Sequence, residues 1–114
     1  MNWTKICPLQ DIVPNTGVGA LIDGHQVAVF RLSDDTVYAI DNFDPHSQAN
    51  VLSRGIVGDL DGQVVVASPI YKQHFNLQTG ECLEDAQASV SAHSIRLCDG
   101  CIEVALSPAV SYAA

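Results

Sequence analysis

The sequence predicts an all-β domain of the sandwich or barrel type. Short runs of β-branched or apolar residues recur along the chain, turn pairs such as Asp-Gly separate them, and no segment keeps a helical period. Short strands at this spacing are typical of all-β sandwiches and barrels. The 114 residues are enough for one domain that buries its own core.

The expected strands follow one another as strand, turn, strand. They span 25–32, 36–42, 63–67, 74–77, 94–97 and 102–106. Asp23-Gly24 and Asp61-Gly62 open two of them, and Asp99-Gly100 between the last two indicates a two-residue hairpin. Cys98 and Cys101 then face each other across that turn as reduced, functionally quiet thiols.

The remaining segments carry weaker signals. Residues 85–92 are expected to form a turn of helix or a loop, and Gly17 and Gly19 are expected in a loop. Those glycines lack the strand and helix that a dinucleotide-binding loop requires. The whole chain, 1–114, is expected to be one domain with a core over about 3–106 and a loose tail over 107–114.

Composition and net charge restrict the classes of partner that we expect. The net charge of −8 and the pI of about 4.5 argue against nucleic acid and anionic membrane surfaces. No apolar run reaches the roughly 20 residues of a membrane span, and the N-terminus lacks the apolar region of a signal peptide, so we expect a cytoplasmic protein. Charged residues make up 16%, which favours exposed apolar surface and a protein contact.

Residues 42–83 have the layout of an iron–sulfur domain. A Rieske [2Fe–2S] centre takes two cysteines and two histidines from a C-x-H box and a C-x-x-H box. Asp44-Pro45-His46 aligns with the first box and Ser68-Pro69-Ile70-Tyr71 with the second, and Phe75 to Gly80 follows as F-x-L-x-T-G. The chain therefore resembles a Rieske domain, with oxygen-bearing side chains at three of the four ligand positions.

The resemblance is closest to one group of such domains. The segments LSRGIVGD (52–59) and VASPIYKQHFNLQTGECLED (66–85) are similar to the small subunit of the assimilatory NAD(P)H-dependent nitrite reductase, over about 3–106. This implies a Rieske-like fold with two tip loops, 44–52 and 68–73. It also implies a large-subunit partner that reduces nitrite to ammonium and carries FAD, a [4Fe–4S] cluster and siroheme.

The candidate site residues lie in these tip loops or directly next to them. Of the four positions that match the lost ligands, Asp44 is expected to cap its own loop, His46 to hydrogen-bond a neighbour, and Tyr71 to fill the space of the cluster. Neither a catalytic residue nor a resident cofactor or metal is expected. The candidates for partner contact are Arg54, Lys72, Gln73 and His74.

Two other functions remain open at this point. The chain would be a Rieske or ferredoxin-type electron carrier if its cysteines replaced the missing ligands, and these are Cys7, Cys82, Cys98 and Cys101. Alternatively, it would be a stand-alone binding module.

Overall fold

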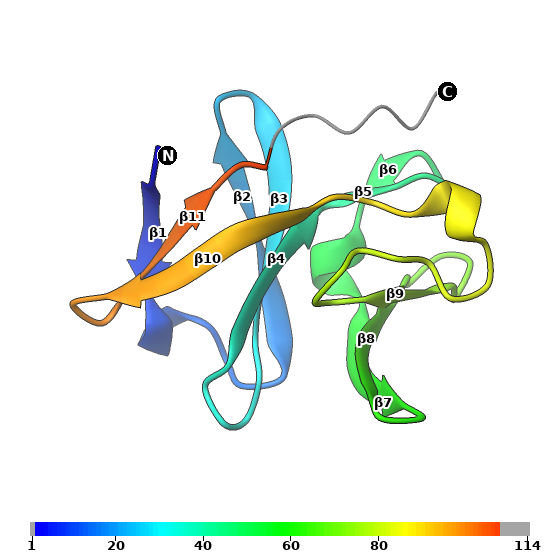
Figure 1. Cartoon of the computed structure of the whole chain (residues 1–114), viewed down its shortest axis with the longest axis horizontal. Coiled ribbons are helices and arrows are strands. Elements are labelled where there is room, and N and C mark those ends of the chain that lie inside the picture. Colours follow the sequence, from blue (N-terminus) through cyan, green and yellow to red (C-terminus); the bar gives the residue numbers. More distant parts are fainter. Residues whose placement is uncertain (1, 108–114) are drawn as a thin grey trace.

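The computed structural model describes residues 2–107, and these form two packed β layers (Figure 1). The larger is a six-stranded antiparallel sheet. In spatial order its strands are β1 (Thr4–Pro8), β11 (Cys101–Ala105), β10 (Ala92–Cys98), β4 (Val37–Asp41), β3 (His25–Arg31) and β2 (Thr16–Ile22). The predicted tail lies, from residue 108 on, outside the described residues.

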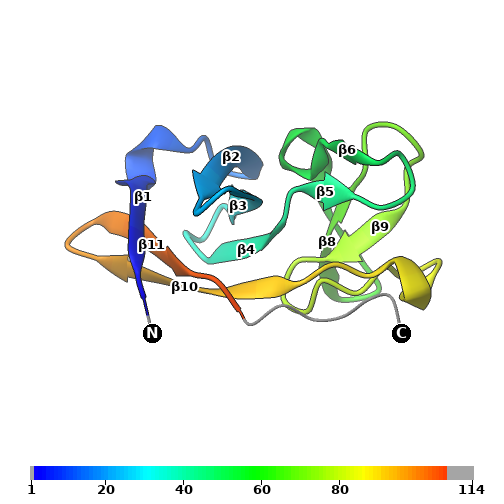
Figure 2. The same ribbon diagram turned by 90° about the horizontal axis from the view of Figure 1, so that it is seen from above.

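Residues 43–90, called here the tip subdomain, form the second layer. A three-stranded sheet contains β7 (Ile56–Leu60), β8 (Gln63–Ala67) and β9 (His74–Asn76), and a short ladder pairs β5 (Phe43–Asp44) with β6 (Ala49–Asn50). The 3₁₀ turns are η1 (Leu9–Asp11), η2 (Leu52–Arg54) and η3 (Ala86–Ala88). Viewed from above, β10 runs from the tip subdomain back along the larger sheet (Figure 2).

β3 is buried on both faces, which explains its unbroken apolar run. Val27 and Val29 face a cluster inside the larger sheet with Ile102 and Val104. Ala28 and Phe30 face the opposite way, into a cluster shared with the tip subdomain. Because successive side chains of a strand alternate between faces, one strand supplies both cores.

Three Asp-Gly pairs turn the chain in the same way. Asp23-Gly24, Asp61-Gly62 and Asp99-Gly100 each link two paired strands, and all six residues have positive φ. A two-residue turn of this conformation has a twist that matches the flanking strands. The hairpin expected at Asp99-Gly100 is confirmed, and the other two pairs form hairpins as well.

The prediction of a loop around Gly17 and Gly19 is wrong, because both lie in β2. A Cβ atom at Gly17 would lie 2.6 Å from the Phe30 ring, so glycine is needed for close packing rather than for a turn. β1, β5, β6 and β7 are likewise not among the expected strands. The expected strands are present to within about two residues, and residues 85–92 contain the turn η3.

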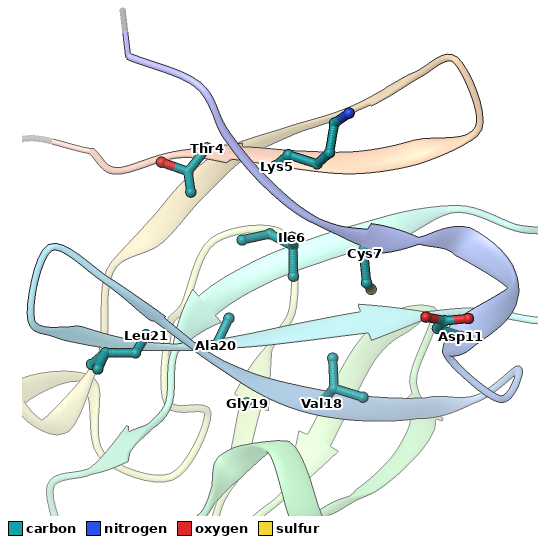
Figure 3. Close-up of a pocket in the computed structure, with 9 residues that line it drawn as sticks. All are labelled: Thr4, Lys5, Ile6, Cys7, Asp11, Val18, Gly19, Ala20 and Leu21. Carbon is teal, nitrogen blue, oxygen red and sulfur yellow. The ribbon is translucent and has the colours of Figure 1, made fainter.

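The larger sheet is nearly closed, and its two edges border a groove. Ile6 and Cys7 of β1 point toward Val18 and Ala20 of β2 across it (Figure 3). The groove has a volume of about 420 Å³, with Lys5 and Asp11 also on its lining. Within residues 2–107, no helix is long and apolar enough to cross a membrane.

The paired cysteines at the end of β10 give a first prediction. Cys98 and Cys101 are free, and they are cross-strand partners at the exposed end of the hairpin. Replacing both with serine should change the free energy of unfolding by less than about 1–2 kcal/mol, because neither thiol belongs to a core cluster.

Urea unfolding of the double variant measures this change. The matched control is Cys82→Ser, which buries a hydroxyl in the core of the tip subdomain and should cost more, because Cys82 is 1% exposed. If the double variant lost as much stability as Cys82→Ser, the pair would have a structural role that we do not assign to it.

Candidate functional site

Asp44 organises the first tip loop. Its Oδ1 accepts the N–H of His46 at 2.9 Å, its Oδ2 accepts the Ser47 hydroxyl at 3.0 Å, and its carbonyl accepts the N–H of Gln48 at 2.7 Å. A carboxylate that binds the backbone two residues ahead forms an Asx turn. The expectation that Asp44 caps its own loop is confirmed.

The second tip loop runs from Ser68 to Gln73. The Ser68 N–H donates to the Gln73 carbonyl at 2.8 Å, and the Lys72 N–H donates to the Ser68 carbonyl at 3.1 Å. Lys72 has a φ of 66°, in the left-handed region that such a tight return requires. The residues between them project from the subdomain.

A buried hydrogen bond joins the two loops. The Ser68 hydroxyl donates to Asp44 Oδ2 at 2.5 Å, and both residues are 0% exposed. Hydrogen bonds to a charged acceptor are stronger than neutral ones, and a buried carboxylate that lacks donors is costly. The contact therefore fixes the two loops relative to each other.

The surroundings of Asp44 favour its charged form. Burial acts in the opposite direction, since it penalises a charge, but the hydrogen bonds from Ser68, His46 and Ser47 outweigh it. Together they hold the pKa of the Asp44 carboxyl below its ordinary value of 3.8. The loop junction is therefore anionic at neutral pH.

His46 lies between two carboxylates. Its Nδ1 is 3.5 Å from Asp44 Oδ1, and its Nε2 is 3.6 Å from Asp85 Oδ2. Nδ1 is nevertheless buried without a hydrogen-bond partner, as is Oε1 of Gln73. The expected hydrogen bond to a neighbour is made by the backbone N–H of His46, which donates to Asp44, while the ring only approaches the two carboxylates.

The expectation that Tyr71 fills the space of a cluster is wrong. Tyr71 is 59% exposed and Ile70 is 47% exposed. The short return from Ser68 to Gln73 directs both side chains outward, and the core below is already filled by Phe75, Leu77 and Val66. Two large side chains are therefore presented to solvent at the end of the molecule.

The residues proposed for partner contact differ in their exposure and in whether a carboxylate binds them. Arg54 and Lys72 are exposed, and Gln73 is half-buried. His74 is held by Glu84, whose Oε2 lies 2.7 Å from Nδ1 and whose Oε1 accepts the His74 N–H at 2.7 Å. In the described chain, carboxylates pair with Arg31 and Arg96 but not with Arg54 or Lys72.

The four cysteines do not form one site. Cys82 belongs to the core of the tip subdomain, whereas Cys98 and Cys101 lie on the hairpin of the larger sheet and Cys7 lies on β1. Burial raises the pKa of both the Cys82 and the Cys7 thiols, which disfavours the thiolate. This arrangement does not supply substitute ligands for a cluster.

Sequence reasoning missed one group of polar residues. His25, Asp41 and His93 converge where β3, β4 and β10 meet, with both imidazoles on Asp41 Oδ1. They are 16 and 52 positions from Asp41, with no motif spacing, so only the strand pairing reveals them. Within residues 2–107 they are the one group of His, Cys, Asp or Glu with ligand atoms close enough for a metal ion.

Known proteins with this fold identify the family. The family described as "Rieske-like [2Fe-2S] domain" matches residues 2–105. The nitrite reductase (NADH) small subunit of Salmonella typhimurium is 48% identical over 103 residues, which cover 90% of this chain and 95% of that protein. This chain belongs to the Rieske-like family of nitrite reductase small subunits. Both the resemblance and the all-β fold predicted from the sequence are confirmed.

Two further proteins are similar to this chain. A crystal structure from Mycobacterium tuberculosis, described as an NADH-dependent nitrite reductase small subunit, is 47% identical with a TM-score of 0.89, over 95% of this chain and 97% of that one. A nitrite reductase [NAD(P)H] large subunit from Klebsiella oxytoca is 42% identical over 98 residues. That match covers 86% of this chain and 10% of the Klebsiella protein.

The residues of this small-subunit family member do not fit the cluster in the family's description. Asp44 and Ser68 stand at the two cysteine positions and are bonded to each other, and Tyr71 at a histidine position is exposed. Iron–sulfur clusters are held by thiolates and, in Rieske centres, two imidazoles. His46 alone retains the required chemistry, so we derive no electron transfer through this chain.

The buried Asp44–Ser68 contact gives the second prediction. Ser68→Ala should lower the free energy of unfolding by about 2 kcal/mol, because a buried carboxylate then loses a donor. The control Ser33→Ala removes an exposed hydroxyl and should stay within about 0.5 kcal/mol of wild type. Equal effects of the two substitutions in urea unfolding would contradict the assignment.

The same contact predicts an acid dependence. Since the pKa of Asp44 is lower in the folded state, its contribution is present above the unfolded pKa, near 3.8, and is lost as pH falls through the folded value. As the pH falls below about 4, the free energy of unfolding should therefore decrease less for Asp44→Asn than for wild type. The slope of unfolding free energy against pH measures this, since the other acidic residues contribute equally to both proteins.

Proposed function

We propose that this chain is the small subunit of an NAD(P)H-dependent nitrite reductase and docks on the large subunit through its tip loops. The observation that carries the proposal is the Klebsiella large subunit, which contains a segment similar to 86% of this chain. In that protein the domain and the rest of the large subunit share one polypeptide. We infer that a small subunit makes the corresponding association through a surface contact.

The proposed role is structural within an oxidoreductase. The large subunit would carry FAD, a [4Fe–4S] cluster and siroheme, bind NAD(P)H and reduce nitrite to ammonium in the cytoplasm. This chain would then act in assembly, stability or regulation and would not be catalytic alone. The donor set at Asp44, His46, Ser68 and Tyr71 supports this role over that of an electron carrier.

The second tip loop has the composition of a contact surface. Ile70 and Tyr71 are exposed beside Lys72, and Arg54 is exposed at η2. Aromatic residues and arginine are enriched at protein interfaces, and exposed apolar groups often mark them. Because the chain has a net charge of −8, these cations stand out on an acidic protein. We infer that the partner surface is an apolar hollow bordered by carboxylates.

This surface gives the fourth prediction. Ile70→Asp and Tyr71→Ala should each weaken binding to the large subunit at least tenfold, or about 1.4 kcal/mol, because each removes an apolar anchor. Lys72→Glu should slow association, since it reverses a charge that attracts the partner. Binding of the purified variants to the isolated large subunit, followed by interferometry, measures both effects.

The opposite end of the molecule supplies matched controls. Leu97 is 45% exposed on β10, close to the Asp99-Gly100 turn, so Leu97→Asp changes a comparable apolar group far from the tip (Figure 1). Lys5→Glu on β1 is the control for charge reversal. If all tip variants bound with wild-type affinity and Leu97→Asp bound more weakly, the contact would lie at the hairpin end of the larger sheet, which would contradict the proposal.

A further inference from the structure

The cluster of His25, Asp41 and His93 lies where the chain passes between the two layers. The chain leaves the larger sheet after Asp41 and returns to it through Ser91. There the Asp41 N–H donates to the Ser91 carbonyl at 2.9 Å, and the Ser91 N–H donates to Asp41 Oδ2 at 3.1 Å. Asp41 thus joins the two segments that connect the layers, and its Oδ1 also accepts hydrogen bonds from the two imidazoles.

Three ligand atoms within 4.8 Å of one another raise the question of a metal site. The hydrogen bonds of His93 decide against one. Its Nδ1 accepts the N–H of Ser107 at 3.0 Å, so the ring proton must be on Nε2, which lies 2.7 Å from Asp41 Oδ1. A histidine that binds a metal through one nitrogen normally donates from the other, and His93 has the reverse arrangement.

Neutral His93 therefore bridges a carboxylate and a backbone amide. Its side chain is 3% exposed, so neither contact is replaced readily by water. Ser107 is held a second time, by its hydroxyl on the Ala92 carbonyl at 2.7 Å. Ser107, two residues after β11, is thus attached to β10 through the imidazole of His93 and the carbonyl of Ala92.

We propose that His93 is a proton-operated latch that holds Ser107, just after β11. Neutral His93 holds the backbone of Ser107, and a second proton on Nδ1 breaks that hydrogen bond. Two N–H groups then face each other, and one of them must move away. Ser107 is the mobile partner, because Asp41 continues to hold the Nε2 side of the ring.

The charged neighbours support this direction of movement. Among the described residues, the titratable groups in contact with His93 are Asp41 of β4 and His25 of β3, whose ring meets that of His93 edge to face at 5.6 Å. Burial penalises the charge on Asp41, but hydrogen bonds from His93, His25 and Ser91 keep its pKa below 3.8. An ionised Asp41 therefore remains to stabilise an imidazolium at its side.

The latch is closed while Nδ1 of His93 accepts the Ser107 N–H, and it opens when Nδ1 carries a proton of its own. Acid therefore opens it and alkali closes it. The two sheets are not expected to separate, because Asp41 keeps its contacts with Ser91 and with the Nε2 side of His93. The response is confined to the attachment of Ser107.

Nuclear magnetic resonance of the full chain tests the proposal. At pH 8, long-range ¹⁵N–¹H spectra should show His93 with its proton on Nε2. Between pH 8 and pH 5, the protection factor of the Ser107 amide should fall at least tenfold, while that of Val104 in β11 stays constant. An Nδ1–H tautomer at pH 8, or a Ser107 amide indifferent to pH, would overturn the latch.

Two substitutions separate the latch from its surroundings. His93→Gln keeps an acceptor for Ser107 and a donor for Asp41 but does not titrate, so Ser107 should stay protected at pH 5. His25→Gln, the matched control, should leave the wild-type transition in place. Zn²⁺ at pH 8 should leave the spectra of both histidines unchanged. Stoichiometric binding of Zn²⁺ there would show that the cluster is a metal site and would contradict the latch.

Discussion

The hydrogen bond between Ser68 and Asp44 is the constraint on which the tip depends. It connects positions 24 residues apart, on two different loops. In a Rieske domain the corresponding positions are cross-linked through a metal cluster. Here a carboxylate and a hydroxyl make the same connection with one proton between them. The shape of the tip is therefore kept without thiolate chemistry, and the second loop stays extended toward solvent.

The segment from Asp41 to Asp44 extends this principle to the whole fold. Asp41 binds β3 and β10, and Asp44 binds the second tip loop. Between them, Asn42 accepts the N–H of Ser53 on its side chain at 2.8 Å and the N–H of Leu52 on its carbonyl at 3.1 Å. Three residues within four consecutive positions thus connect the larger sheet, η2 and both loops. Buried polar groups are costly unless bonded, so these contacts select one arrangement of the two layers.

The sequence predicts the architecture well where local chemistry decides it. Apolar runs bordered by Asp-Gly pairs locate β3, β8 and the last hairpin, because turn residues act within a few positions. β2 escaped prediction because Gly17 looks like a loop residue, whereas its missing side chain makes room for Phe30. Only the packed structure reveals that requirement.

The same distinction between local and long-range effects applies to the candidate site. The resemblance to a Rieske domain places Asp44, His46, Ser68 and Tyr71 on two loops, and the Asx turn of Asp44 is a local effect that sequence can indicate. The bond from Ser68 to Asp44 and the exposure of Tyr71 depend on how the loops approach each other. The meeting of His25, Asp41 and His93 depends on strand order, which no local pattern reveals.

The most direct test of a tip held without a metal is thermal unfolding of the chain, purified from iron-replete cells, with and without a strong chelator. Where metal binding contributes to folding, removal of the metal lowers stability. We predict a colourless protein without iron and one cooperative transition whose midpoint is unchanged by the chelator. A Rieske-type spectrum, or a midpoint that falls by more than about 5 °C, near 1 kcal/mol for a domain of this size, would contradict it.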